Sequence, residues 1–247
     1  MPSGVERLVK SVLRRRAIDA ALDRLRFALD TFPQTGPLAR FSHSSYQPLP
    51  WLGLADSKRA GGSRSRWLAI EGVLDELDGL ATAADLGANY GFFTIELARR
   101  GLATVAVESG PSAYRTALYA LRRTGVRDAG VLVLELGPGT IELLPRTDVV
   151  LFLSLWHHLV RDHGPEQATR LVRELWAHTG RVLFFDTGES EMPSEFRLPR
   201  MEPDGRTWLE AFLRETCAGG EVRYLGLHDA FDADGAPARR NLFAVVR

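Results

Sequence analysis

A short apolar run that ends in an acidic residue and a glycine-bearing loop constrains this chain more than any other feature. Residues 81–86 predict a buried strand, which runs into the loop Asp85–Gly91 and then into a helix beginning at about Phe92. Gly87 and Gly91 let the backbone pass close to a ligand, because no β-carbon stands in the way. The following helix points its first N–H groups into the same space. This unit therefore predicts a ligand site at the end of a strand.

The rest of the chain continues the alternation of strands and helices. Strands are expected at 81–86, 104–107, 131–136, 148–155, 181–185, 222–227 and 242–246. Helices are expected at 67–77, 92–100, 111–123, 166–178 and 208–215. This alternation predicts an α/β fold with a doubly wound, mainly parallel, seven-stranded sheet and helices on both faces. The last two strands predict a closing hairpin, and so an antiparallel C-terminal strand.

The segment before this alternation has a different character. Residues 1–32 carry apolar stripes at helical spacing, and residues 57–66 are polar and contain glycine. We therefore expect an N-terminal helical and irregular extension over residues 1–66, followed by the sheet domain over residues 67–247. The amphipathic stripes could cover the chain's own sheet or a partner subunit, so a homo-oligomer remains one alternative.

Composition narrows the function classes. Lys+Arg and Asp+Glu both number 31, so the formal net charge is zero, whereas a domain that binds nucleic acid usually has a basic excess. The one cysteine, Cys217, excludes an internal disulfide and a thiolate metal cage. No apolar run approaches the length of a membrane span, and the N-terminus has no apolar signal core. We expect a soluble, cytoplasmic protein with a small-molecule partner, no membrane and no nucleic acid.

A second acidic residue fits the ligand site. Glu108 ends the second predicted strand, about 17 residues after Gly91. A carboxylate at this position can accept hydrogen bonds from both hydroxyls of a ribose. The loop lacks the third glycine of the G-x-G-x-x-G dinucleotide fingerprint. The pattern therefore favours an amino-acid-bearing nucleoside over a pyrophosphate.

Asp85–Gly91, followed by Phe92-Phe93-Thr94, resembles motif I of the class I S-adenosylmethionine-dependent methyltransferases, and Glu108 resembles their ribose-binding acid. The resemblance covers roughly residues 81–247. It implies a Rossmann-like methyltransferase in which Asp85 organises the loop and Glu135, after the third strand, contributes to the adenine pocket. It also implies that the cofactor's methionine portion contacts the loop at Gly87, Ala88, Asn89, Tyr90 and Gly91. Gly137-Pro138-Gly139 departs from the family's usual pattern near the adenine pocket.

Two histidines follow the fourth predicted strand. His157 and His158 follow the carboxyl end of a central strand, at the same edge of the predicted sheet as the loop Asp85–Gly91. Methyl transfer to a hydroxyl requires removal of its proton, and the near-neutral pKa of histidine suits that task. We expect one of the two to be the general base and favour His158, because Trp156 and His157 would turn the chain. The alternative is a histidine that caps the next helix or packs structurally.

Acidic residues follow the fifth predicted strand. Asp186, Glu189 and Glu191 fall within six positions, which is also typical of a solvated loop. The functional interpretation is recognition of a hydroxylated substrate, with Asp186 as a further catalytic candidate because it ends the strand itself. Another functional interpretation is a Mg²⁺ site formed by Asp186, Glu189 and His158. The ion would lower the pKa of the hydroxyl that receives the methyl group.

The segment after these acids is expected to contact the acceptor. Arg197, Arg200, Arg206 and Trp208 offer charged donors and an aromatic face, which suit a carbohydrate ring. The loop sequence also resembles the family branch that methylates hydroxyls of sugars and secondary metabolites. We predict an O-methyltransferase for a small polar acceptor, a saccharide or sugar-containing metabolite such as a precursor of a methylated mannose polysaccharide. Transfer to a tRNA wobble uridine and a non-catalytic nucleoside-binding scaffold are the alternatives.

Overall fold

The chain divides into two compact units, residues 1–44 and residues 45–247. The computed structural model describes residues 17–22, 24–25, 47–53, 55, 57, 59–232 and 234–247. In the first unit the described residues are helical and exposed. The rest of the helical prediction over residues 1–32 lies outside the described residues. The second unit contains the sheet.

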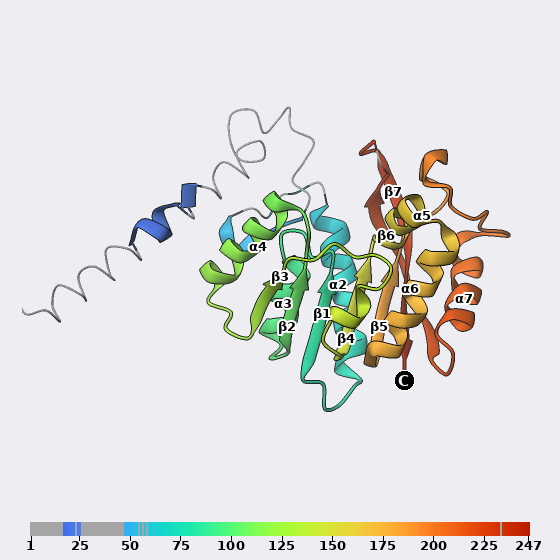
Figure 1. The fold of residues 1–247 in the computed structure, drawn as a ribbon, viewed down its shortest axis with the longest axis horizontal. Coiled ribbons are helices and arrows are strands. Elements are labelled where there is room, and N and C mark those ends of the chain that lie inside the picture. Colours follow the sequence, from blue (N-terminus) through green and yellow to red (C-terminus); the bar gives the residue numbers. More distant parts are fainter. Residues whose placement is uncertain are drawn as a thin grey trace, which may run out of the picture. The chain divides into compact units, whose positions relative to one another are not determined.

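Seven strands form one sheet in the order β3-β2-β1-β4-β5-β7-β6 (Figure 1). They are β1 (Thr82–Leu86), β2 (Ala103–Val107), β3 (Ala129–Leu132), β4 (Thr147–Leu153), β5 (Thr179–Asp186), β6 (Glu221–Phe231) and β7 (Pro237–Val246). Strands β1 to β5 pair in parallel, whereas β7 lies antiparallel between β5 and β6. The predicted doubly wound, mainly parallel sheet with an antiparallel C-terminal strand is thus confirmed.

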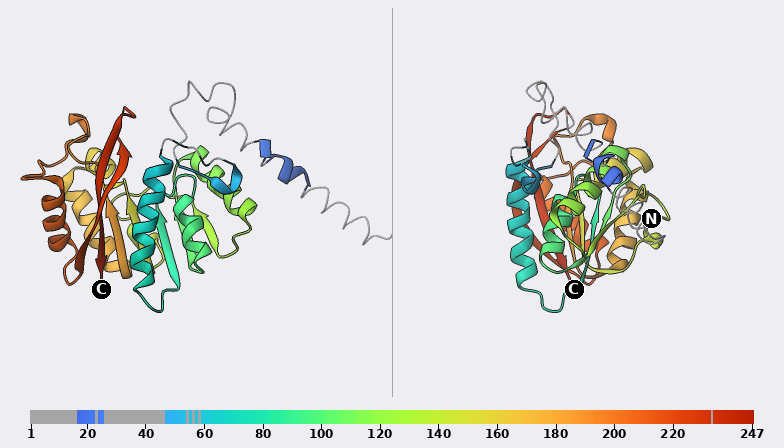
Figure 2. Two further views of the ribbon diagram at one scale, coloured as in Figure 1. Left: turned by 180° about the vertical axis from the view of Figure 1, so that it is seen from behind. Right: turned by 90° about the vertical axis from the view of Figure 1, so that its left-hand side faces the viewer.

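Helices cover both faces of this sheet (Figures 1 and 2). They are α2 (Ala60–Asp75), α3 (Phe92–Arg99), α4 (Pro111–Thr124), α5 (Trp156–His163), α6 (Pro165–His178) and α7 (Gly205–Thr216), with 3₁₀ turns η1 (Pro50–Leu52), η2 (Ile141–Leu143) and η3 (Ser194–Phe196). Alternate residues of β4 face opposite sides, so Leu151 packs with α2 and α3 while Phe152 packs with α5, α6 and α7. No helix among the described residues combines the length and apolar character needed to cross a bilayer.

Helix α2 begins earlier than the sequence predicts. Its first turn, from Ala60, falls in the polar stretch that was expected to be a loop, and the predicted start was Trp67. Ser63 and Arg66 are buried, and a Cβ on Gly62 would lie 2.0 Å from the carbonyl oxygen of Asp229 in β6. Contact with a strand distant in the sequence therefore stabilises a helical turn whose local composition is that of a loop.

Other elements also differ from expectation: β6 and β7 are longer than predicted, and two further differences bear on the site. Strand β3 covers Ala129–Leu132 and not residues 131–136, so the following residues leave the sheet. Helix α5 was not predicted and begins directly after β4, because the chain turns at Ser154, whose φ is 56°. Both differences place residues of the candidate site at the carboxyl edge of the sheet.

The contact between α2 and β6 can be tested with two neighbouring glycines. Gly62→Ala is expected to lower the free energy of unfolding by about 1–3 kcal/mol, because the added Cβ would meet the Asp229 carbonyl. Gly61→Ala is the matched control: nothing lies within 4 Å of its Cβ, so it should raise stability by about 0.5–1 kcal/mol. Urea unfolding measures both, and equal effects would contradict the packing of this turn against β6.

Candidate functional site

The loop between β1 and α3 is held in a curved conformation by β2. Gly87, Asn89 and Gly91 have positive φ values of 66°, 52° and 83°. The N–H groups of Gly87 and Ala88 both donate to the carbonyl of Val107, at 2.8 and 3.0 Å. A Cβ on Gly87 would lie only 2.7 Å from Leu155. Glycine is therefore required at this point both for the backbone conformation and for the close approach of Leu155.

Asp85 lies beneath this loop. Its carboxylate is buried and accepts a hydrogen bond of 2.6 Å from the hydroxyl of Thr94 in α3. Burial raises the pKa of Asp85 to about 7, although the hydrogen bonds from Thr94 act in the opposite direction. Asp85 therefore links the end of β1 to α3.

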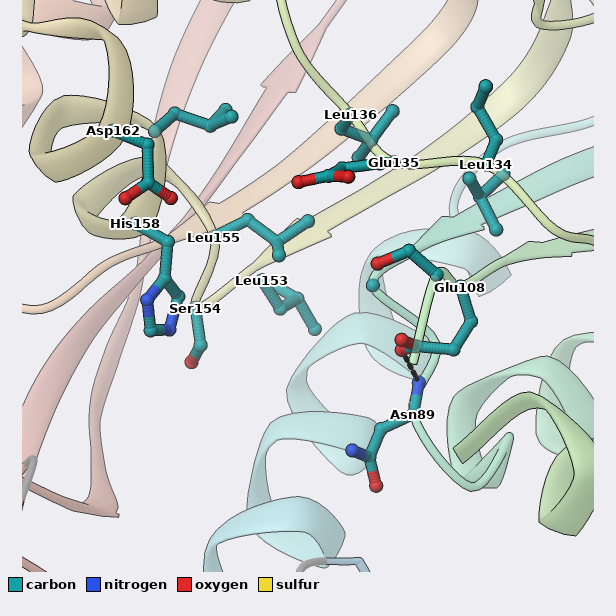
Figure 3. A pocket seen from close by; sticks show the side chains of 14 residues that line it. Asn89, Glu108, Leu134, Glu135, Leu136, Leu153, Ser154, Leu155, His158 and Asp162 are labelled. Carbon is teal, nitrogen blue, oxygen red and sulfur yellow. Dashed lines mark hydrogen bonds between the residues drawn. The ribbon is translucent and has the colours of Figure 1, made fainter. Parts of the chain in front are cut away.

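Glu108 lies at the end of β2, facing the loop. One carboxylate oxygen accepts the N–H of Asn89 at 2.9 Å (Figure 3), and the other accepts the N–H of Gly110 at 2.7 Å. Each carboxylate oxygen has a second lone pair, so both can accept one more hydrogen bond. Backbone donors thus orient Glu108 while leaving it able to bind a pair of hydroxyls.

A cavity of about 250 Å³ lies between this region and α5. Figure 3 shows Glu108 and Asn89 at one end, His158 and Asp162 at the other, and leucines between them. It is lined by Gly87, Asn89, Val107, Glu108, Ser109, Leu134, Glu135, Leu136, Leu153, Ser154, Leu155, His158, Leu159 and Asp162. Five of the predicted site residues thus line this one cavity: Gly87, Asn89, Glu108, Glu135 and His158. The other predicted loop residues, Ala88, Tyr90 and Gly91, do not line it.

A second, smaller compartment of about 30 Å³ adjoins the cavity and shares Gly87, Leu153 and Ser154 with it. Its other lining residues are Gln47, Arg59, Ser63, Arg66, Asp85, Leu86 and Phe93. The sequence pattern did not predict the contribution of Gln47, Arg59, Ser63 and Arg66. The first two helical turns of α2 bring Ser63 and Arg66 here, and no local signal distinguished these turns from a polar loop.

His158 contributes its ring to the larger cavity from the first turn of α5. Among the described residues, neither ring nitrogen has a hydrogen-bond partner, and the ring packs against Phe196 with 5.7 Å between centroids. Burial lowers the pKa of His158 below its usual value. The charged groups around it act in both directions: Arg161, Arg240 and Arg59 lower the pKa, and Asp162 raises it. His158 is therefore neutral at pH 7 and can accept a proton.

His157 has a different environment. It is 2% exposed, its Nδ1 accepts the N–H of Gly188 at 2.9 Å, and its backbone N–H donates to Thr187 at 3.1 Å. Burial lowers the pKa of His157 to about 2. It does not line the cavity, and its ring lies 4.2 Å from that of His158. Of the two predicted histidines, His157 thus lies inside the protein between His158 and the loop after β5, and only His158 lines the cavity.

Asp186 also has a structural environment. It is fully buried and accepts hydrogen bonds from Arg66 at 2.7 Å and from the N–H and hydroxyl of Ser154 at 2.6 and 2.9 Å. Burial alone would raise the pKa of Asp186, but the charges of Arg66 and Arg240 and the hydrogen bonds hold it below its usual value. The expected catalytic role of Asp186 therefore conflicts with its geometry, because its oxygens bind α2 and the end of β4.

The predicted Mg²⁺ site is not found. Within the part of the chain that the structure describes, no three His, Cys, Asp or Glu side chains are grouped to hold a metal ion. The carboxylate of Glu189 accepts hydrogen bonds from the backbone and side chain of Asn241, at 2.7 to 3.0 Å. Asp186 is bonded to Arg66, so Asp186, Glu189 and His158 do not form the expected ligand set.

The four residues expected to contact the acceptor lie in different places. Arg197 and Arg200 line a cavity of about 620 Å³ formed by the segment between β5 and α7. Arg206 lies instead over the ring of Tyr224, at 4.1 Å, and Trp208 is stacked on Phe212. Only the first two therefore remain candidates for contact with an acceptor in this cavity.

The environment of Asp85 predicts a pH dependence of stability. Its pKa is raised from 3.8 to about 7 on folding, so the native state loses stability as the pH rises between these values. Asp85→Asn removes the titrating group. The free energy of unfolding of the variant minus that of wild type should therefore increase by about 1.4 kcal/mol for each pH unit, up to about pH 7. Urea unfolding at pH 5, 6, 7 and 8 measures the difference, with the exposed Asp78→Asn as control. A constant difference would contradict the raised pKa.

Comparison with known proteins places this geometry in a known fold. No protein-family model and no curated protein sequence matches the chain. The bifunctional kinase-methyltransferase WbdD is 22% identical over 88% of this chain, with a TM-score of 0.66. The match covers 46% of WbdD, so this chain spans about half its length.

Two further structures share the fold. Magnesium protoporphyrin IX methyltransferase (ChlM) from Synechocystis PCC 6803, solved with bound SAM, is 13% identical with a TM-score of 0.58, over 90% of this chain and 96% of ChlM. EvdMO1 is 17% identical with a TM-score of 0.52, over 77% of this chain and 42% of EvdMO1. The expected resemblance is thus confirmed at the level of structure: this chain has the fold of class I S-adenosylmethionine-dependent methyltransferases.

Proposed function

We propose that this chain is an S-adenosylmethionine-dependent O-methyltransferase. The observation that carries the proposal is a pair of adjoining compartments at the carboxyl edge of the sheet, each lined by a residue that has a buried polar atom without a partner. Asn89 lines the larger compartment and Ser63 the smaller, and among the described residues Asn89 Oδ1 and Ser63 Oγ have no hydrogen-bond partner. Buried polar groups are almost always paired, so these two atoms fit a polar ligand that extends through both compartments.

The larger compartment suits a nucleoside. Glu108 is already oriented by two backbone N–H groups, and it would accept the hydroxyls of the ribose. Leu134 and Leu136 offer apolar faces for a purine, and Glu135 beside them offers an acceptor for its amino group. The amino-acid end would lie in the smaller compartment, near the hydroxyl of Ser63 and the guanidinium of Arg59.

His158 is the proposed general base. When bound, the cofactor supplies an electrophilic methyl group. A ring nitrogen of His158 would take the proton of the acceptor hydroxyl as the acceptor oxygen bonds to the methyl carbon, and the sulfur–carbon bond of the cofactor would break to leave S-adenosylhomocysteine. His157 supports this ring, because its hydrogen bond from Gly188 holds the start of α5 against the loop after β5.

The proposed acceptor is a saccharide or another small polyhydroxyl compound. The lining of the cavity between β5 and α7 includes hydroxyl and charged groups, among them Ser190, Ser194 and Arg197, beside proline, leucine and methionine side chains. Phe196, in the same segment, packs against His158. Polar groups on the acceptor side and a neutral base beside them support transfer to a hydroxyl.

Cofactor binding is tested by calorimetry. Wild type should bind S-adenosylmethionine and S-adenosylhomocysteine, and Glu108→Ala should weaken both by about 1–3 kcal/mol, because charge-assisted hydrogen bonds to the ribose are lost. Glu142→Ala, at an exposed position in η2, is the matched control and should leave affinity unchanged. Preferential binding of NAD, or no binding of either nucleoside to folded protein, would contradict the proposal.

The base is tested with labelled cofactor and a panel of monosaccharides, glycosides, phenols and tRNA. With the acceptor found, His158→Ala should lower kcat by about 10²–10⁴ without changing the affinity for S-adenosylhomocysteine. The base works when neutral, so activity should fall at acid pH with a midpoint below 6.5. His157→Asn, which keeps an acceptor near the Nδ1 position, should retain most activity. Full activity of His158→Ala between pH 5 and 8 would remove His158 from the mechanism, and methylation of tRNA alone would replace the saccharide proposal.

A further inference from the structure

A groove of about 590 Å³ lies on the side of the sheet covered by α6 and α7. Its walls include Trp156, from the start of α5, and Trp208 and Phe212, from α7. It shares no lining residue with the cavity that contains Glu108 and His158. Trp156 and His158 are two positions apart on one helix, so their side chains leave it in nearly opposite directions. The groove is therefore separate from the proposed methyl-transfer site.

Three aromatic rings make up much of this groove. Trp208 and Phe212 are stacked, with centroids 5.2 Å apart and an angle of 11° between the rings. Trp156 lies 6.0 Å from Trp208 and 5.0 Å from Phe212, at inclined angles. Trp208 and Phe212 are only partly buried, so part of the stacked pair remains accessible. Such a surface favours contact with a flat ring.

The indole N–H of Trp156 has no acceptor among the described residues, although Trp156 is 1% exposed. In the same part of the chain, the indole N–H of Trp176 donates to the carbonyl of Ala218 at 3.1 Å. Four other buried polar atoms of the described residues also lack partners: Asn89 and Ser63 line the two compartments proposed for the cofactor, whereas Ser57 and Thr116 line none of the cavities described above. Trp156, like Asn89 and Ser63, lines a hollow. By the same reasoning, the unpaired donor of Trp156 indicates a ligand with an acceptor atom.

The charges at the rim of the groove are already compensated. Arg170 forms an ion pair of 2.9 Å with Glu174, and Arg173 forms one of 3.2 Å with Glu215. Glu166 adds a further carboxylate at the rim. An anionic ligand would therefore find no unpaired guanidinium at these two positions, which favours a neutral molecule.

We propose that this groove is a second binding site, which takes a small, planar, neutral molecule that carries a hydrogen-bond acceptor. Its ring would pack on Trp208 and Phe212, and its acceptor would receive the N–H of Trp156. This site shares no lining residue with the two compartments proposed for the cofactor, and it shares only Pro199 with the cavity between β5 and α7 that is proposed for the acceptor. Its test measures binding of the small molecule and not methyl transfer, so a failure of the proposed reaction would not decide it.

The test uses benzamide, which has a flat ring and a carbonyl acceptor, with ¹⁵N-labelled full-length protein. Among the indole N–H resonances, that of Trp156 is identified by its loss in Trp156→Phe. Benzamide should move this resonance downfield and saturate, while the Trp176 resonance stays in place because its N–H is already bonded. Benzoate and benzylamine, the charged analogues, should bind at least 10-fold more weakly. Saturating S-adenosylhomocysteine should not displace benzamide.

Two variants test the stacked rings and the indole N–H separately. Trp208→Ala removes one ring of the stacked pair and should weaken benzamide binding at least 10-fold. Trp156→Phe keeps an aromatic ring but removes the indole N–H, so it should also weaken benzamide binding. Because the Trp156 resonance is lost in this variant, binding is measured from the Trp208 resonance. The proposal is overturned if the Trp156 resonance does not respond to benzamide in folded protein, or if Trp208→Ala binds it unchanged. A downfield position of the Trp156 N–H in the free protein would also overturn it, because it would show that the donor already has a partner.

Discussion

The buried ion pair between Arg66 and Asp186 is the interaction on which the site depends. Its atoms are 2.7 Å apart, and it joins the first turns of α2 to the end of β5. Asp186 also binds the backbone and hydroxyl of Ser154, the residue at which the chain turns from β4 into α5. Removing one member of such a pair leaves an uncompensated buried charge, at a cost of about 3–5 kcal/mol. The position of His158 thus rests on a charge interaction that does not face the cavity.

The same network extends to the loop after β5. Arg240, in β7, donates to Ser154 at 3.1 Å and to Glu191 at 2.8 Å, and its neighbour Asn241 binds Glu189. Consecutive residues of β7 therefore hold the two glutamates of this loop. Together with the bond from Gly188 to His157, these contacts fix the segment next to the proposed acceptor cavity. A site built this way is largely preorganised, so less ordering is required when a ligand binds.

Chemically similar residues at the strand ends have acquired different roles through their surroundings. Glu108 is held by backbone N–H groups and lines the cavity, whereas Asp186 is enclosed by arginine and serine. The adjacent histidines differ in the same way: the Nδ1 of His157 is occupied, while His158 reaches the cavity. Neighbouring positions of a helix point about 100° apart, so one ring lies inside the protein and the other faces the cavity.

Local patterns were sufficient for the order of the seven strands along the chain, the glycine-bearing loop and the acid at the end of β2. These features depend on residue periodicity and on the conformational freedom of glycine, both of which are properties of short segments. The early start of α2 and the structural role of Asp186 could not be predicted in this way. Arg66 and Asp186 are 120 residues apart, and Gly62 meets a carbonyl of β6, so these roles exist only once the chain is folded. The sequence by itself thus determined which strand ends carry polar groups. The tertiary structure decided which of those groups are neutralised by distant partners and which face the cavity, because burial and pairing depend on contacts between remote segments.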